Sequence, residues 1–251
     1  MQDIDCWESK FQSCEYSDKL LNLIIELNKK AKVPVNLSEI KKACHVAREY
    51  HGDQKRKSGD PYYSHPLIVA YLFAKYVAEN TPKYYTTDLI IIAILHDTIE
   101  DTTLTYEMIV EIFSEVIAEG VKDLTRLNNE IKTTAADTVN HLFEQYKFDI
   151  LNIKIFDRLH NIRTISAMKP EKARKIIQET LVHFVLVASR LQLHEISEEL
   201  EILCLEASLS FMDARQLLLD DSEISLEDSD LIFFLISQNE ITQKQNLKLL
   251  E

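Results

Sequence analysis

Glycine is scarce in this chain, and that scarcity limits the folds it can adopt. Only 3 of the 251 residues are Gly and 5 are Pro. Tight β-hairpins and short βα loops depend on residues that tolerate positive φ, and glycine adopts such angles at little cost. A chain with so few glycines has little material for many such turns. The composition therefore predicts an all-α fold.

Apolar residues recur at every third or fourth position along most of the chain, as in Leu20, Leu23, Ile24 and Leu27. This spacing places them on one face of a helix. The apolar run at 89–95 continues without a break into polar residues, so its length indicates a buried helix rather than a strand. No strand-and-turn unit is expected. Further helices are predicted at about 38–51, 105–113, 115–127, 131–146, 149–168, 171–192 and 195–210.

The sequence divides into a main body and an acidic C-terminal segment. Residues 1–200 are expected to form one helical domain, with its motif-bearing core at about 38–200. From residue 201 onward, eleven residues are acidic and three are basic. Apolar pairs such as Leu217–Leu218 and Phe233–Phe234 indicate short helices rather than a disordered tail. We therefore expect an acidic helical extension over 201–251.

The formal net charge of −13 disfavours a nonspecific nucleic-acid binder or a binder of anionic membranes. The chain has no apolar stretch long enough to span a membrane, and its first residues lack the pattern of a signal peptide. We therefore expect a cytoplasmic protein with no nucleic-acid or membrane partner, and the sequence leaves a homo-oligomer open. The cysteines show no metal-type spacing and are expected to be reduced: Cys6, Cys14, Cys44 and Cys204.

The string ILHDTIED carries the first candidate site residues, His96, Asp97, Glu100 and Asp101. On a continuous helix these side chains would spread over roughly 140° of one face. Three carboxylates within five residues repel one another, so their burial would be costly without a cation. A divalent metal is the natural compensation, and a solvated helix end is the alternative.

The string NIKIFDRLHNIRT supplies a second polar stripe. Asp157, Asn161 and Thr164 stand at i, i+4 and i+7 of a helix whose other positions are mostly apolar. A carboxylate aligned with an amide and a hydroxyl suits ligand contact. The alternative is an ordinary amphipathic helix with its polar face in water.

The third element is the loop at 52–65, which holds two glycines and three consecutive cations and ends at His65. Loops on a helical scaffold often carry binding residues. His65 would add a second imidazole to His96, Asp97 and Asp157. Two imidazoles and two carboxylates with open positions suit Mn²⁺, Fe²⁺ or a catalytic Zn²⁺ better than a closed structural zinc site. Such a metal lowers the pKa of a bound water.

Three strings, RKSGDPYYSHPLIVA, AILHDTIEDTTLT and KIFDRLHNIRT, together resemble the signature blocks of the RelA/SpoT hydrolase domain. That domain is an all-helical fold of the HD superfamily. One departure is that His51 is followed by Gly52 and Asp53, so the glycine of the family's pattern before the arginine loop is displaced by one position. No motif of a synthetase domain follows residue 200. The resemblance therefore implies a small, hydrolase-only enzyme.

The resemblance implies a role for each matching residue. The metal ligands would be His65, His96, Asp97 and Asp157. The metal would be Mn²⁺, with Zn²⁺ or Fe²⁺ as alternatives. The residues that position or deprotonate the attacking water would be Glu100 and Asp101. The residues that recognise guanine and its nucleoside would be Arg56, Lys57, Ser58, Asn161 and Thr164. His160 is expected to orient Asp157, and His45 is expected to be structural.

The substrate implied by the resemblance is guanosine 3′,5′-bis(diphosphate) or its pentaphosphate form, hydrolysed at the 3′-pyrophosphate. Two alternatives stay open. An HD phosphohydrolase acting on another nucleotide, such as the 2′-phosphate of NADPH, would use the same metal set. A non-catalytic regulator that binds the alarmone or a metal would keep the fold, although the acidic pair Glu100 and Asp101 argues against it.

Overall fold

The structure is a computed structural model of the chain, and it describes residues 6–125, 127–128, 131–132 and 134–218. It divides into two compact units, residues 1–201 and 202–251. The elements of the N-terminal half are α1 (Trp7–Lys10), α2 (Glu15–Asn28), α3 (Leu37–His51), α4 (Ser64–Asn80), η2 (Pro82–Tyr84), α5 (Thr87–Leu95), α6 (Thr98–Asp101), α7 (Tyr106–Ile112) and α8 (Glu115–Leu124).

The C-terminal half of the described chain is also built from helices. Its elements are β1 (Leu127–Asn128), β2 (Ile131–Lys132), α9 (Ala135–Glu144), α10 (Phe148–Arg163), η3 (Ile165–Ala167), α11 (Pro170–Glu179), η4 (Thr180–Phe184), α12 (Val185–Arg190) and α13 (His194–Leu218). The prediction of an all-α fold is confirmed, because the strands in the described residues are these two short ones.

Helix α5 forms the centre of the core. Every residue from Leu89 to Leu95 is buried, and the helix packs on α3, α4 and α8. A helix that is apolar on all sides belongs in the interior. Burying each large aliphatic side chain contributes roughly 1.5–3 kcal/mol. This packing fixes the end of α5, which is where His96 begins the candidate site.

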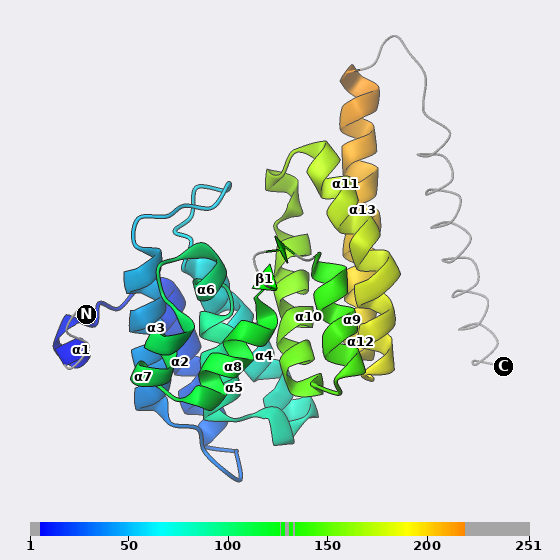
Figure 1. Ribbon diagram of the computed structural model, residues 1–251. Coiled ribbons are helices and arrows are strands. Elements are labelled where there is room, and N and C mark those ends of the chain that lie inside the picture. Colours follow the sequence, from blue (N-terminus) through cyan, green and yellow to red (C-terminus); the bar gives the residue numbers. More distant parts are fainter. Residues whose placement is uncertain (1–5, 126, 129–130, 133, 219–251) are drawn as a thin grey trace. The chain divides into compact units, whose positions relative to one another are not determined.

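Helix α10 brings polar groups into the interior. It lies between α4 on one side and α9 on the other (Figure 1). Its apolar residues join the core, and several polar residues are buried as well: Asn152, Lys154, Asp157, Arg158 and His160. The interpretation of this helix as amphipathic with a polar face in water is therefore wrong. Its polar stripe lines a cavity instead.

The helices predicted over 131–146 and 171–192 differ from the observed ones. Residues 131–132 pair antiparallel with 127–128, so the helix expected over 131–146 starts at Ala135. The hydroxyl of Thr134 accepts from the backbone N–H of Asp137, and the Asp137 carboxylate accepts in return, which forms a capping box at this later start. The helix expected over 171–192 is interrupted by the π-helical turn η4. There Thr180 donates its hydroxyl to the carbonyl of Ile176 at 2.6 Å.

Helix α13 begins in the first unit and continues past residue 201 to Leu218. The domain boundary predicted at residues 200–201 therefore falls within a continuous helix. Leu217 and Leu218 belong to this helix, whereas Phe233 and Phe234 lie outside the described residues, as does most of the predicted acidic extension. Among the described helices, none has the length and apolar character that a membrane crossing requires.

Candidate active site

A cavity of about 370 Å³ opens in the first unit where the loop after α3 faces α6, α10 and α11. All of the predicted site residues line this cavity: Arg56, Lys57, Ser58, His65, His96, Asp97, Glu100, Asp101, Asp157, Asn161 and Thr164. These residues come from three segments that are far apart in the sequence. The packing of α4, α5 and α10 brings them together.

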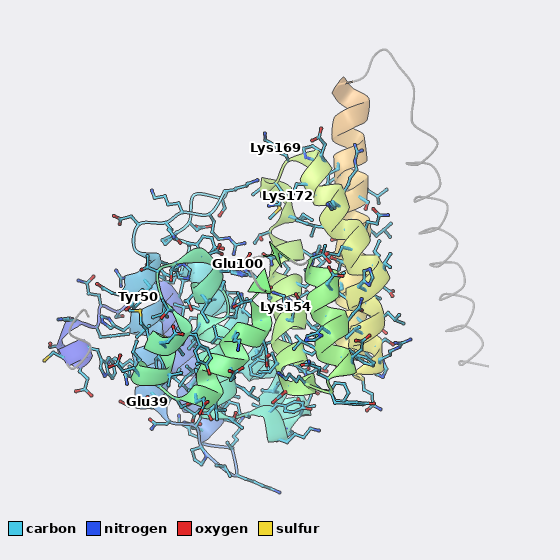
Figure 2. The ribbon with its side chains drawn as sticks, viewed as in Figure 1. Glu39, Tyr50, Glu100, Lys154, Lys169 and Lys172 are labelled. Carbon is cyan, nitrogen blue, oxygen red and sulfur yellow. The ribbon has the colours of Figure 1, made fainter. Side chains whose placement is uncertain are left out.

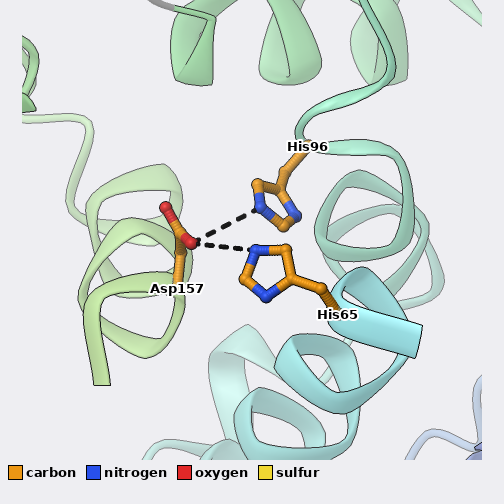
Figure 3. A group of neighbouring side chains, drawn as sticks. All are labelled: His65, His96 and Asp157. Carbon is orange, nitrogen blue, oxygen red and sulfur yellow. Dashed lines mark ion pairs between the residues drawn. The ribbon is translucent and has the colours of Figure 1, made fainter. Parts of the chain in front are cut away.

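Three of the predicted metal ligands converge at the base of this cavity. Nε2 of His65 lies 3.1 Å from Oδ1 of Asp157, and Nε2 of His96 lies 3.7 Å from the same oxygen (Figure 3). One ligand atom from each residue lies within 4.8 Å of the others. All three residues are buried. This geometry could hold a metal ion.

Asp97, the fourth predicted ligand, also has an atom available for a cation. Its Oδ1 lies 3.2 Å from Nε2 of His51. Its Oδ2 is buried and has no hydrogen-bond partner among the described residues. A buried carboxylate oxygen without a partner is costly unless a cation compensates it. The donor set and this oxygen therefore fit a divalent metal.

The pKa shifts of His65, Asp97 and Asp157 suit metal binding, whereas the pKa of His96 is raised because Asp97 and Asp157 outweigh its burial. Burial lowers the pKa of His65 by more than Asp157 raises it, so the ring is neutral. Burial raises the pKa of Asp97, but His96 and His51 outweigh it and bring the pKa to about 2. The pKa of Asp157 also falls well below its usual range, because Lys154 and His65 outweigh burial. Neutral imidazoles and ionised carboxylates are the forms that ligate metals.

His51 is a site residue that the sequence reasoning missed. Its Nδ1 lies 3.0 Å from Oε1 of Gln54, and the Nε2 of Gln54 donates to the backbone oxygen of Asp101 at 2.8 Å. This second bond fixes which amide atom of Gln54 faces the ring. Both nitrogens of His51 therefore face acceptors, and the pKa of His51 is raised because Asp97 and Gln54 outweigh its burial. The signal that could have identified His51 is its position three residues before Gln54, at the start of the loop that carries Arg56.

The acidic pair lines the same cavity, but not from a continuous helix. Helix α5 ends at Leu95 and α6 begins at Thr98, so the prediction of one helical face through His96 and Asp101 is wrong. The hydroxyl of Thr98 donates to the carbonyl of Leu95 at 2.7 Å and satisfies the end of α5. Figure 2 shows Glu100 facing the interior between α6 and α10.

Tyr62 is a second residue that the sequence reasoning missed. Its hydroxyl donates to Oδ2 of Asp101 at 2.6 Å. Its ring stacks on His51 with a centroid distance of 4.8 Å. Burial and the nearby carboxylates of Asp97 and Asp101 raise the pKa of Tyr62, so the hydroxyl remains a donor. Tyr62 lies within the string RKSGDPYYSHPLIVA, but the sequence assigned it no role, because Asp101 is 39 residues away.

The loop from Gly52 to Tyr63 holds its cations in a tight turn. The backbone N–H of Arg56 donates to the oxygen of Asp60 at 2.9 Å, and Gly59 has φ of 93°, which favours glycine. Ser58 donates its hydroxyl to Asp60 at 2.7 Å. The displaced glycine, Gly52, itself takes a positive φ of 51° at the end of α3.

Arg56 and Asn161 connect the loop to the metal-ligand cluster. Nη2 of Arg56 donates to Oδ1 of Asn161 at 3.3 Å, and Nδ2 of Asn161 donates to Oδ1 of Asp157 at 2.7 Å. The sequence predicted that His160 orients Asp157, but no hydrogen bond joins these two residues in the described part of the chain. Nδ1 of His160 lies 2.7 Å from Nδ1 of His65 instead. Burial, His65 and Arg56 together lower the pKa of His160 to about 3, so its ring is neutral.

Three cations in the cavity wall were not predicted. Lys154 and Arg158 come from α10 and Lys172 from α11, and Figure 2 shows Lys154 and Lys172 on these neighbouring helices. Nζ of Lys154 lies 3.2 Å from Oδ2 of Asp157. The cavity of this acidic protein therefore carries six lysine or arginine side chains, counting those of the loop: Lys55, Arg56, Lys57, Lys154, Arg158 and Lys172.

The sequence matches the family model described as HD domain over residues 43–194. It is 38% identical to GTP pyrophosphokinase rsh of Brucella abortus over 184 residues, which covers 71% of this chain and 24% of that protein. It is 37% identical over 171 residues to guanosine-3′,5′-bis(diphosphate) 3′-pyrophosphohydrolase of Aquifex aeolicus, covering 67% of this chain and 24% of the relative. The matched region thus spans about a quarter of these relatives.

Two further similarities agree with these. The bifunctional (p)ppGpp synthase/hydrolase SpoT of Escherichia coli is 36% identical over 177 residues, covering 68% of this chain and 24% of the relative. A solved structure of a metazoan ortholog of SpoT, described as hydrolysing ppGpp, superposes with a TM-score of 0.53 at 17% identity. It covers 66% of this chain and 93% of the other, and at this identity it supports the fold alone. The predicted resemblance to the RelA/SpoT family is confirmed.

Proposed function

Because the chain belongs to the HD domain family, we propose that it is a metal-dependent hydrolase that removes the 3′-pyrophosphate of guanosine 3′,5′-bis(diphosphate) or its pentaphosphate form. The observation that carries this proposal is the meeting of three separated motifs in one cavity, with the ligand cluster at its base and cations in its wall. The names of the relatives from Aquifex aeolicus and Escherichia coli point to the same reaction.

The metal would be held by His65, His96, Asp97 and Asp157. The unpartnered Oδ2 of Asp97 supports including this residue beside the three that converge on one another. A bound divalent cation polarises a phosphoryl oxygen and lowers the pKa of a water molecule. Mn²⁺ is the proposed metal, since mixed nitrogen and oxygen ligands with open positions suit it.

Glu100 and Asp101 would position the attacking water and accept its proton. Their carboxylates line the cavity on the side of α6, beside the cluster. Asp101 is oriented by the hydroxyl of Tyr62 and by Gln54, which donates to its backbone oxygen. A carboxylate held by such bonds presents a fixed oxygen to water, as general acid–base catalysis requires.

The nucleotide would lie between the loop and α10. The guanidinium of Arg56 is planar and stacks well on a base, while Lys57, Ser58, Asn161 and Thr164 line the adjoining wall. Lys154, Arg158 and Lys172 would offset phosphate charge deeper in the cavity. Six cations and five carboxylates line the cavity, so its side chains carry about one net positive charge, and a bound divalent metal would add two more in a protein of net charge −13.

The test is a panel of substrates assayed for both pyrophosphate and phosphate under Mn²⁺, Zn²⁺ and no added metal. We expect pyrophosphate from guanosine 3′,5′-bis(diphosphate) with Mn²⁺, and little turnover without metal. Phosphate release from NADPH with no cleavage of the guanosine compound would favour the other HD phosphohydrolase. Tight binding of the guanosine compound without any turnover would favour a non-catalytic regulator.

The base preference is tested separately through Arg56. Arg56→Ala should raise KM for the guanosine substrate, because loss of stacking costs roughly 1–3 kcal/mol per base at comparable sites. The metal content should not change. Adenine analogues should be poorer substrates of the parent, and this preference should shrink in the variant. Equal cleavage of adenine and guanine compounds by the parent would remove guanine recognition from the proposal.

A further inference from the structure

The Nδ1 atom of His160 faces two side chains with different proposed tasks. It lies 2.7 Å from Nδ1 of His65 and 3.4 Å from Nη1 of Arg56. His65 belongs to the ligand cluster, and Arg56 belongs to the nucleotide loop. His160 is buried and comes from the same helix as Asp157. It is therefore one of two side chains that join Arg56 to the ligand cluster; the other is Asn161, which reaches Asp157.

The chemistry of these three groups restricts where the protons lie. A guanidinium donates hydrogen bonds and cannot accept them, and a neutral imidazole has one N–H and one acceptor nitrogen. Because the two Nδ1 atoms are 2.7 Å apart, one of them must carry the shared proton. Two arrangements are therefore available without any change in net charge. The proton is either on Nδ1 of His65 or on Nδ1 of His160.

The two arrangements treat Arg56 in opposite ways. With the proton on His65, Nδ1 of His160 is an acceptor: its single lone pair takes the N–H of His65 at 2.7 Å and attracts the N–H of Arg56 more weakly at 3.4 Å. With the proton on His160, an N–H group points toward the guanidinium, which has nothing to accept it. The first arrangement holds Arg56 at the cavity wall, and the second repels it.

The same choice decides whether His65 can ligate through Nε2. This nitrogen faces Asp157 and His96, so it needs its lone pair free to bind a cation. A neutral His65 with a free Nε2 carries its proton on Nδ1, which is the arrangement that attracts Arg56. Cation binding and the position of Arg56 thus favour the same pair of tautomers.

We propose that His160 is a positioning residue that couples the metal centre to the guanidinium of Arg56, so that metal binding tightens nucleotide binding. This inference rests on the proposed function, because it takes His65 as a ligand and Arg56 as a nucleotide contact. Coupling of this kind is reciprocal, so a bound nucleotide should tighten metal binding by the same factor.

Calorimetry can measure the coupling with GDP as the probe, since GDP lacks a 3′-pyrophosphate to be cleaved. The dissociation constant of GDP is measured with and without saturating Mn²⁺. The coupling factor is the ratio of the dissociation constant without Mn²⁺ to that with Mn²⁺. GDP also chelates Mn²⁺ directly, so the coupling factor of each protein is compared with that of Arg56→Ala, which keeps the proposed ligands but lacks the guanidinium. The parent should exceed Arg56→Ala by a factor on the order of 5 to 10.

Variants of His160 then separate coupling from a structural role. Asn places a polar group near the position of Nδ1, whereas Gln places it near Nε2 and leaves the Nδ1 position without an acceptor. His160→Asn should keep most of the amount by which the parent's coupling factor exceeds that of Arg56→Ala. His160→Gln should lose it. Thermal melting of both variants checks that they fold alike.

A second measurement reports the tautomers directly. In protein labelled with ¹⁵N at histidine, addition of diamagnetic Zn²⁺ should leave Nδ1 of His160 unprotonated and Nδ1 of His65 protonated. A proton on Nδ1 of His160 in the metal-bound protein would overturn the inference, as would equal coupling in the parent, His160→Gln and Arg56→Ala with normal binding of both ligands. Failure of the parent to bind GDP would instead overturn the proposed function, and this inference with it.

Discussion

Nε2 of His51 lies 3.2 Å from Oδ1 of Asp97 and leaves the other oxygen of that buried carboxylate without a partner among the described residues. The histidine thereby occupies Oδ1 and leaves Oδ2 as the oxygen of Asp97 that a cation could take. Supporting residues of this kind orient metal ligands, and their loss typically lowers metal affinity by 10- to 100-fold. His51 would thus orient a proposed ligand without being one of the proposed ligands itself.

The first prediction concerns this pair. His51→Phe keeps a ring that can stack on Tyr62 but removes both nitrogens, so Asp97 is free to rotate. We expect Mn²⁺ affinity to fall about 10- to 100-fold while the binding stoichiometry stays the same. Calorimetric titration with Mn²⁺ measures both quantities. Unchanged affinity in a folded variant would show that Asp97 needs no support from His51.

The second prediction concerns metal-dependent stability. A metal that binds the folded state and is present at 100 times its Kd raises the free energy of unfolding by about 2.7 kcal/mol. The parent should therefore melt several degrees higher with Mn²⁺ than with a chelator, by about 2–4 °C per kcal/mol for a chain of this size.

Asp97→Asn should lose most of this shift, because a neutral amide is a poorer ligand and no longer offsets the cation. Asp53→Asn is the matched control, since Asp53 is an exposed carboxylate in the loop after α3 and does not line the cavity. Metal analysis that finds undiminished stoichiometry in Asp97→Asn would remove this residue from the ligand set.

The third prediction separates turnover from metal binding. Glu100→Gln and Asp101→Asn should lower kcat by on the order of 10²-fold or more, as expected for groups that handle the water proton. Their metal content should match the parent. If both variants keep full turnover, these carboxylates do not act on the water.

Tyr62→Phe should lower kcat by less than Asp101→Asn, because it removes the hydroxyl that orients Asp101 but leaves the carboxylate in place. A hydrogen bond to a charged group contributes about 1.5–3 kcal/mol. In the double variant the two effects should not add, since both residues act through one group. Additive losses in kcat would mean that Tyr62 acts independently of Asp101.

The fourth prediction compares two arginine–glutamate pairs. Nη2 of Arg158 donates to Oε2 of Glu179 at 2.6 Å, and the arginine is buried beneath the ring of Phe184 at 4.0 Å. Glu179→Ala leaves this cation without its partner and should cost about 3 kcal/mol in the free energy of unfolding. Glu199→Ala removes the partner of Arg163 in a half-exposed pair and should cost at most about 1 kcal/mol. Urea unfolding of the two variants tests the ranking, and equal costs would contradict it.

The fifth prediction concerns pH. Burial lowers the pKa of His45, which packs beside Trp7. The unfolded chain therefore takes up the proton at a higher pH than the folded protein does, and stability is lost as pH falls from about 6.5 toward the folded pKa. His45→Gln has no such proton to bind, so its free energy of unfolding should fall less than that of the parent between pH 7 and pH 5. Denaturant titrations at several pH values measure this, and parallel curves would refute it.

The sequence by itself determined the helical class and the location of the site segments. Scarce glycine and apolar spacing of three and four residues are local properties, and helix formation responds to them directly. The three motifs also identified His65, His96 and Asp157 as candidates, which the structure brings within reach of one ion. The short strands at 127–128 and 131–132 and the π-helical turn within the helix predicted over 171–192 escaped the prediction, because apolar spacing does not report them.

Only the tertiary structure decided which side chains support the predicted ones. His51 meets Asp97, and Tyr62 meets Asp101, across separations of 46 and 39 residues. His160 meets His65 rather than Asp157 across 95 residues. Helical periodicity says which residues share a face, but it does not say which face of another helix they meet. That choice is set by how the buried faces of α4, α5 and α10 pack, a property of the whole core.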